Sequence, residues 1–331
     1  MNNRIPSSPP AITPVAPLEK RPLWSVLIPT YNCMEWLPQT LESVLIQDPG
    51  PEKMQIEVVD DSSTDGDVGA MVQKIGKGRI GFFQQEKNQG SLRNFETCLN
   101  RSKGHLVHLL HGDDLVFEGF YKEVETMFIR FPKAGAAFTR YAYINDENVI
   151  TPPGKQLLNE PGIIGDFLLQ IAQKQLLQAA CMVVKRSVYE HLGSFFAVHY
   201  GEDWEMWTRI AAHYPVAYSP ACLALYRGGQ GHSASITSNS LSTGQNIRDI
   251  TTVIEIVQNY LPEEKRKLLK KIAVKNFSRA YAKASNRIYL HNPNAAFVQA
   301  SGALKMNADI KTIYWVMKLY WLHFTKLIRN P

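Results

Sequence analysis

Two pairs of aspartates are the residues of this sequence best suited to chemistry, because each pair stands at or just beyond the end of a run of apolar residues. The first pair is Asp60 and Asp61, and the second is Asp113 and Asp114. Any one of these residues, taken singly, can be explained as a cap of the next helix or as part of a turn. Two acidic pairs at one edge of a sheet would repel each other. Such a site favours a cation or a ligand rich in hydrogen-bond donors.

Short apolar runs that alternate with amphipathic stretches would bring the two pairs together. The sequence predicts strands over 24–28, 56–60, 79–83 and 105–110, and helices near 35–46, 66–75, 91–101 and 118–130. Strands that alternate with helices indicate parallel pairing in an α/β sheet. Ligands of such sheets bind at the carboxyl ends of the strands, which is where both aspartate pairs fall.

The region 134–236 is expected to complete the sheet and to add a third acidic patch. We predict a strand over 179–185, then a helix that opens at 201–203 and runs to about His213, then a short strand that ends at Tyr218. The segment from Leu225 to Ser235 contains several glycines, which favours a mobile loop over regular structure. Asp203, near the start of the helix, is either a helix cap or a functional carboxylate.

Composition and charge narrow the class of protein. The chain has 331 residues, of which 45% are hydrophobic and 20% are charged, and this excludes a disordered chain or a disulfide-stapled miniprotein. The net charge of +6 is unevenly divided: residues 1–261 carry −5, whereas residues 262–331 carry +11. None of the four cysteines forms a C-x-x-C pair, so we expect a reducing, cytoplasmic location.

The two ends of the chain have a different character. Residues 1–22 contain six prolines and lack the apolar stretch of a secretory signal, so they predict a disordered arm. Beyond about residue 240, helical periodicity dominates. The expected helices cover roughly 246–259, 262–288, 293–305 and 308–328.

Three interpretations of the basic segment 262–331 remain open. It can pack as a helical cap, form the contact of a homo-oligomer, or hold the protein at the anionic inner face of the cytoplasmic membrane as a peripheral protein. Its longest apolar stretch, 313–324, is interrupted by Lys318 and is too short to span a bilayer. No nucleic-acid recognition motif accompanies the positive charge, so no nucleic-acid partner is expected.

Six segments, taken in order, resemble the family 2 glycosyltransferases with the GT-A fold. They are SVLIPTYN at 25–32, EVVDDSSTDG at 57–66, NQGSLRN at 88–94, LLHGDD at 109–114, GEDWEMWTRIA at 201–211 and YRGGQGHSAS at 226–235. The resemblance covers about residues 24–236. It implies an α/β fold of the nucleotide-diphospho-sugar transferase type, Rossmann-like, with a mixed sheet flanked by helices. The expected organisation is the arm 1–22, a catalytic domain 23–240 and a basic helical region 241–331.

The resemblance also implies an activity. It implies an inverting, non-processive enzyme that moves a hexose or N-acetylhexosamine from a nucleotide-sugar, with a preference for UDP-sugars, to a hydroxyl of a glycan or lipid-linked acceptor. Such an enzyme would serve the biosynthesis of surface polysaccharide or glycan and would use Mn²⁺ or Mg²⁺. The processive synthases of this family carry a Q-x-x-R-W motif and spanning helices, and neither is found in this sequence.

By the same resemblance, individual residues acquire roles. Asp203 would be the general base. The metal ligands would be Asp114, Asp113 and His232. The nucleotide-sugar would contact Pro29, Thr30, Tyr31, Asp60, Asp61, Arg93, Asp113, Glu202 and Arg227. Tyr31 would stack on the base, and Arg227, on a closing loop, would contact a phosphate.

The sequence departs from the common family pattern at two places. His111 stands where many members carry the first Asp of a D-x-D-D run. Arg93 follows the Asn88-x-Gly90 motif sooner than the corresponding arginine does in many relatives.

Two other classes of function remain as alternatives. A sugar nucleotidyltransferase on a related fold would need a glycine-rich basic loop after the first strand, where residues 29–32 stand instead. A non-catalytic nucleotide-sugar-binding module would not need Asp113, Asp114 and Asp203 together.

Overall fold

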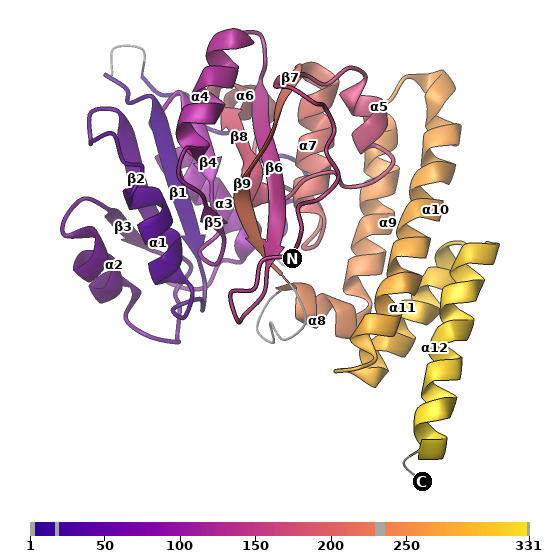
Figure 1. Ribbon diagram of the computed structural model, residues 1–331. Coiled ribbons are helices and arrows are strands. Elements are labelled where there is room, and N and C mark those ends of the chain that lie inside the picture. The colour runs from indigo at the N-terminus through magenta and orange to yellow at the C-terminus, as the bar shows by residue number, and fades with distance from the viewer. Residues whose placement is uncertain (1–3, 17–19, 229–235, 330–331) are drawn as a thin grey trace. The chain divides into compact units, whose positions relative to one another are not determined.

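The computed structural model describes residues 4–16, 20–228 and 236–329 (Figure 1). The chain divides into two compact units. The first holds the described parts of 1–167, 176–197 and 209–229, and the second those of 168–175, 198–208 and 230–331. The sequence predicted boundaries after residues 22 and 240. The two compact units are discontinuous, because two short segments before residue 240 belong to the second unit.

The first unit is built on one nine-stranded sheet in the order β3-β2-β1-β4-β8-β6-β9-β5, with β7 paired to β9. The strands are β1 Trp24–Thr30, β2 Met54–Asp60, β3 Gly81–Gln84, β4 Leu106–Leu109, β5 Leu115–Val116, β6 Ala136–Ile144, β7 Gly162–Ile163, β8 Met182–Lys185 and β9 Val216–Arg227. The expected mixed α/β sheet flanked by helices is thereby confirmed.

The N-terminal half of the sheet is parallel, as the alternation of strands and helices predicted. Strand β1 pairs in parallel with β2 and β4, and β2 pairs in parallel with β3. All seven residues of β1 are buried, which is why this strand is a continuous apolar run rather than an alternating one. In this register Thr30 lies opposite Asp60, so the carboxyl ends of β1 and β2 meet at one edge.

Five helices of the first unit connect these strands: α1 Leu37–Leu45, α2 Val68–Gly76, α3 Ser91–Arg101, α4 Phe120–Arg130 and α6 Arg186–Leu192. The first four correspond to the expected helices. Figure 1 shows α1 and α2 on one face of the sheet and α3 on the other. Right-handed crossovers produce this arrangement, because the chain moves outward from β1 to β3 and then returns past β1 to β4.

The C-terminal half of the sheet differs from the sequence prediction in two strands. Residues 179–181 form a 3-10 helix, and only Met182–Lys185 is a strand. Strand β9 does not end at Tyr218 but continues to Arg227, so part of the predicted loop from Leu225 is strand. Pairing explains the extra length: β9 runs parallel to β6 up to Arg227 and antiparallel to β5 at Leu225.

Residues 4–16, expected to be a disordered arm, are held against the first unit by backbone carbonyls. Ser194 N donates to Pro10 O at 2.8 Å, and Ala197 N donates to Pro6 O at 2.9 Å. Prolines lack N–H groups but keep their carbonyls, so a proline-rich segment can still accept such bonds. Ile12 is 2% exposed, which adds an apolar anchor.

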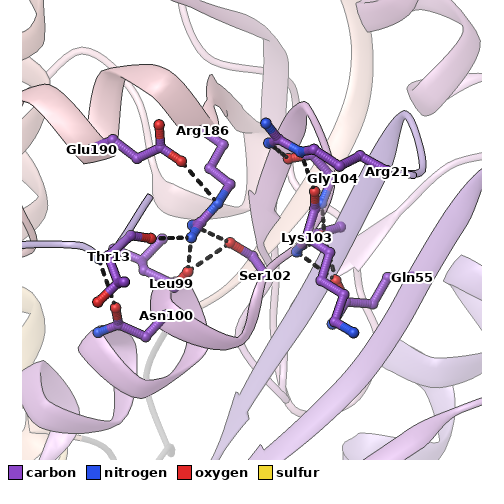
Figure 2. A network of polar contacts seen from close by, with 11 residues as sticks. Thr13, Arg21, Gln55, Leu99, Asn100, Ser102, Lys103, Gly104, Arg186 and Glu190 are labelled. Atoms are coloured by element: carbon purple, nitrogen blue, oxygen red, sulfur yellow. Dashed lines mark hydrogen bonds and ion pairs between the residues drawn. The ribbon is translucent and has the colours of Figure 1, made fainter. Parts of the chain in front are cut away.

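The same arm is also held by a buried arginine at the start of α6 (Figure 2). The Arg186 guanidinium donates to Thr13 O at 2.7 Å, to Leu99 O at 2.7 Å and to the Ser102 hydroxyl at 3.0 Å. Its Nε lies 3.2 Å from a carboxylate oxygen of Glu190, one turn further along α6. One buried cation therefore connects the arm, the end of α3 and α6.

The second unit is helical. Besides α5 Phe167–Ile171 and the first residues of α7 Glu202–His213, it contains α8 Ile236–Thr243, α9 Gln245–Val257, α10 Glu263–Ile288, α11 Pro293–Met306 and α12 Ile310–Arg329. Pro262 caps α10 and Pro293 opens α11, as expected of prolines at helix starts. Helix α8 was not foreseen. Among the described residues, no helix is both long and apolar enough to cross a membrane.

Candidate active site

The loops after β1 and β2 are tied together at the carboxyl edge of the sheet. Asn32 N donates to the Ser63 hydroxyl at 2.9 Å, and Thr64 N donates back to Asn32 Oδ1 at 2.8 Å. Asn32 adopts a φ of 49°, which an asparagine tolerates better than most residues. Pro29 and Thr30 are buried in β1, whereas Tyr31 is 50% exposed. Of the three residues expected to line a nucleobase pocket, Tyr31 is thus the one that presents a ring to a ligand.

The aspartate pair after β2 is buried and already accepts hydrogen bonds from the protein. Asp61 accepts from the backbone N–H groups of Gln89 and Gly90, at 2.6 and 2.8 Å. Asp60 accepts from the Ser63 hydroxyl and from Gln84 Nε2. Burial raises the pKa of Asp61, and the two backbone donors oppose that rise. The pair therefore fixes the loop before α3, and any bond to a base N–H would use the remaining lone pairs.

The loop after β4 is positioned by contacts with β1 and α1. Thr40 of α1 donates its hydroxyl proton to Gly112 O and Asp114 O, at 3.0 and 2.8 Å. A Cβ on Gly112 would lie 2.6 Å from Cys33 Sγ, so a larger residue would push this loop away. The glycine thus permits the close approach that holds His111 and the second aspartate pair at the edge of the sheet.

His111, Asp113 and Asp114 form a cluster whose ligand atoms all lie within 4.8 Å of one another. Asp114 is fully buried; its Oδ1 accepts from Arg227 N at 2.7 Å. Its Oδ2 has no hydrogen-bond partner among the described residues and lies 3.9 Å from His111 Nδ1. A buried carboxylate oxygen without a donor is costly unless a cation faces it. The donor set of two carboxylates and an imidazole fits a divalent metal ion.

Electrostatics at the cluster agree with this fit. Burial, and then the charge of Asp113, raises the pKa of Asp114 well above its usual range. Burial lowers the pKa of His111, which keeps the imidazole neutral and therefore able to ligate. The His111 ring is also stacked on Phe95, with 5.3 Å between ring centroids. A cation beside these groups would favour the ionised form of both aspartates.

The structure places Arg227 differently from the closing loop expected for it. It is the last residue of β9 and is 2% exposed. Its Nε donates to Asp113 O at 2.9 Å, and Nη1 donates to Asn145 O at 2.8 Å. Its guanidinium carbon lies 4.1 Å above the Trp36 ring centroid. Arg227 thus contacts both aspartates, and its other guanidinium donors are engaged by Asn145, Gln39 and Asn148.

Asp203 lies in the first turn of α7, in the second unit. It accepts a hydrogen bond from Gln175 Nε2 at 2.6 Å and one from Trp204 N at 2.7 Å. Burial raises the pKa of Asp203 to about 6, against the effect of these donors. Burial, then the charge of Asp203, also raises the pKa of Glu202 well above its usual range. A carboxylate with a pKa near 6 is suited to accept a proton at neutral pH.

The helix start that carries Asp203 is packed firmly. Trp204 is fully buried, donates its indole N–H to Ile171 O at 2.8 Å, and lies 4.7 Å from Phe277 of α10 between ring centroids. Trp207 is 2% exposed, so both tryptophans are core residues, and only the carboxylates at the helix start remain for chemistry.

Two further expected residues lie elsewhere. Arg93 pairs with Glu96 one turn along α3 at 2.6 Å, and both line a surface depression of about 410 Å³ that contains none of the acidic cluster. His232 lies outside the described residues.

Three residues of the site were missed by sequence reasoning. They are His111 as a ligand, Thr40 and Gln175. For His111 the signal was present, because it stands two residues before Asp113 in the motif. Nothing in the local sequence marks Thr40 or Gln175.

A mixed sheet with an acidic cluster at the carboxyl edge of its parallel half is typical of the GT-A fold. Residues 25–193 match the family model described as glycosyl transferase family 2. The chain belongs to this family and is a glycosyltransferase, as its sequence motifs predicted.

Two relatives and one solved structure illustrate the similarity. An uncharacterised protein of Mycobacterium tuberculosis is 26% identical over 254 residues, which are 69% of this chain and 73% of that protein. The poly(ribitol-phosphate) beta-N-acetylglucosaminyltransferase TarP of Staphylococcus aureus is 38% identical over 97 residues, but only 28% of this chain and 29% of TarP are aligned. Residues 1–349 of S. aureus TarS, solved with UDP-GlcNAc, share the fold with a TM-score of 0.55 and 14% identity, covering 84% and 89% of the two chains.

Proposed function

We propose that this chain is an inverting, non-processive glycosyltransferase that moves a sugar from a UDP-sugar to a hydroxyl of a glycan or lipid-linked acceptor. The observation that carries the proposal is the His111, Asp113 and Asp114 cluster, with its buried, unpartnered Asp114 Oδ2 at the carboxyl edge of the sheet. Family membership supplies the reaction class.

Mn²⁺ or Mg²⁺ would be held by Asp114, Asp113 and His111, and His232 stays a further proposed ligand. When bound, such an ion neutralises negative charge on the leaving diphosphate. Arg227 would support this arrangement, because its backbone N–H donates to the Asp114 carboxylate and its Nε donates to the Asp113 carbonyl.

The donor would lie across the loops after β1 and β2. The proposed nucleotide-sugar contacts are Pro29, Thr30, Tyr31, Asp60, Asp61, Arg93, Asp113, Glu202 and Arg227. Among them Tyr31 has the exposure that stacking requires, and Asp61 has the burial and rigidity that base recognition requires. The UDP-GlcNAc bound to TarS, a protein of the same fold, supports uridine as the nucleotide.

In the proposed chemical step, Asp203 is the general base. Asp203 takes the proton of the acceptor hydroxyl while that oxygen attacks the anomeric carbon and the bond to the diphosphate breaks. The leaving group is UDP, and one displacement inverts the anomeric configuration. The raised pKa of Asp203, about 6, provides the basicity, and Gln175 orients the carboxylate.

The names of relatives narrow the biological setting. TarP is named for the addition of N-acetylglucosamine to poly(ribitol-phosphate), and a further relative, TuaG of Bacillus subtilis, is named for teichuronic acid biosynthesis. We infer from these names a role in surface polysaccharide synthesis with an N-acetylhexosamine or hexose donor. A thermal-shift screen of UDP-sugars with Mn²⁺ would identify the donor.

A pair of isosteric variants tests the assigned roles. For Asp203→Asn we expect transfer to be lost while UDP binding, measured by calorimetry with Mn²⁺, is unchanged. For Asp114→Asn we expect binding of UDP with Mn²⁺ to be lost. Transfer that survives in Asp203→Asn would refute the base, and full activity of the wild type in EDTA would remove the metal from the mechanism. If the wild type binds UDP-sugars but transfers sugar to no acceptor, the result would favour a non-catalytic nucleotide-sugar-binding module.

A further inference from the structure

Helix α12, the last helix in Figure 1, carries an apolar face that the described part of the second unit leaves open to solvent. Six side chains on it are more than half exposed: Ile310, Tyr314, Met317, Tyr320, Trp321 and Phe324. Apart from the adjacent Tyr320 and Trp321, successive members are three or four residues apart, which places all six on one side of the helix. We call them the apolar stripe. At about 1.5 Å per residue the stripe is about 21 Å long. Contiguous apolar surface of this size marks an interaction site.

The opposite face of α12 is packed, so the direction of the stripe is set by the fold of this unit. Thr312, Val316 and Leu319 are buried. His323 shares a hydrogen bond of 2.8 Å with Tyr289, the residue that ends α10 as its C-cap. Asp309 caps the helix start through Thr312 N at 2.9 Å. The helix cannot rotate to hide the stripe without breaking these contacts.

Positive charge borders the stripe. Lys311 and Lys318 of α12 are exposed and lie about 90–120° around the helix from the centre of the stripe. Lys318 and Lys283 of α10 both lie beside Trp315, with Nζ 5.2 and 5.8 Å from the ring centroid. Residues 310–329 contain no Asp or Glu, and Asp309 before them is ion-paired with Arg279.

This combination fits one partner best. A second copy of the chain would bring two segments of net charge +11 together, which opposes self-association through this face. An anionic lipid surface has the complementary charge, and aromatic rings favour the boundary between headgroups and acyl chains. We propose that α12 lies flat in the headgroup region of an anionic bilayer, with the apolar stripe toward the acyl chains and Lys283, Lys311 and Lys318 toward lipid phosphates.

Flotation of the full chain with lipid vesicles tests the proposal. We expect binding to vesicles of phosphatidylcholine that contain phosphatidylglycerol, and weak binding to phosphatidylcholine alone. The triple variant Met317→Ser, Trp321→Ser, Phe324→Ser should lower partitioning at least about tenfold, because it removes the side chains that enter the bilayer. The matched control is Ile46→Ser with Ile129→Ser, which removes apolar side chains 70% and 72% exposed on the first unit and should change nothing.

Variants of the lysines separate the contribution of charge to vesicle binding from that of the apolar stripe. Lys311→Gln and Lys318→Gln should each lower partitioning to the anionic vesicles about fivefold. Added salt should reduce the difference in partitioning between the wild type and these variants, because salt screens exposed charges.

Two results would overturn the proposal. One is flotation of the triple variant equal to that of the wild type. The other is a wild type that does not float but sediments as a dimer that the triple variant dissociates, which would make the stripe a contact between copies. UDP binding, measured on the same variants, confirms that they are folded. The same measurement tests the proposed glycosyltransferase function separately, because that function can be right or wrong independently of membrane binding.

Discussion

At the scale of single residues, the proposed reaction depends on the protonation of Asp203. Its pKa is raised to about 6, mainly by burial, so the carboxylate is protonated below that pH and cannot accept a proton. We therefore predict that kcat rises as the pH increases through about 6, from about a tenth of its plateau at pH 5 to about nine tenths at pH 7. A pH profile of transfer measures this, and a flat profile from pH 5 to 8 would contradict the assignment of the base.

Gln175 provides a second residue-scale prediction. Its amide donates to Asp203, and this bond lowers the pKa of the carboxylate because it favours the charged form. For Gln175→Ala we expect the rising limb of the pH profile to move upward by about one unit, since a hydrogen bond to a charged group is worth about 1.5 kcal/mol. UDP binding should not change. A uniform loss of activity without a shift of the limb would indicate a merely structural role.

At the scale of elements, the loop after β4 is positioned by contact between glycine and cysteine. A Cβ at residue 112 would lie 2.6 Å from Cys33 Sγ. We predict that Gly112→Ala weakens binding of UDP with Mn²⁺ at least about tenfold by displacing the loop that carries the proposed metal ligands. Adding Cys33→Ala should restore most of the affinity, because it removes the clashing atom. Gly165→Ala is the control, since a Cβ there meets nothing within 4 Å.

A rescue that fails although Gly112→Ala/Cys33→Ala is folded would mean that the glycine is needed for another reason. Circular dichroism and the melting temperature of the double variant establish whether it is folded.

A second prediction at this scale concerns the N-terminal arm. Arg186 is 1% exposed and joins Thr13, Leu99 and Ser102 (Figure 2). We predict that Arg186→Ala lowers the free energy of unfolding by about 3 kcal/mol, because it leaves buried carbonyls and Glu190 without their partner. Urea denaturation measures this. The control is Lys122→Ala, an exposed residue of α4, which should cost less than about 0.5 kcal/mol.

If Arg186 acts through the arm, deletion of residues 4–13 should lower stability by less in Arg186→Ala than in the wild type. The losses of stability caused by two changes are smaller together than their sum when both changes remove the same contact. Strictly additive losses would show that the arm and the arginine stabilise the protein independently.

At the scale of the whole molecule, the described metal-ligand candidates belong to one of the two compact units. His111, Asp113 and Asp114 lie in the first unit, and Asp203 lies in the second. We predict that Mn²⁺ with UDP slows amide hydrogen exchange in the loops after β1, β2 and β4. Ligand binding to the folded state opposes local opening. Slower exchange confined to α8–α12 would contradict the proposed location of the donor site. In Asp114→Asn, Mn²⁺ with UDP should no longer slow exchange in the loops after β1, β2 and β4.

The sequence by itself determined the parallel half of the sheet, four of its helices and the acidic motif at its edge. Those features depend on local patterns: an apolar run buried on both faces, a helical period, a polar residue where a strand ends. It also determined the family, because six short motifs in order carry it.

Only the tertiary structure decided how the site is held. Arg227 is 113 residues from Asp114 and meets it because β9 is lengthened by pairing with β6 and β5. Gln175 reaches Asp203 from another segment, and the proline-rich arm is held through carbonyls that every residue has. Such contacts produce no periodic pattern in the sequence, because the tertiary fold determines which backbone groups and which distant residues meet.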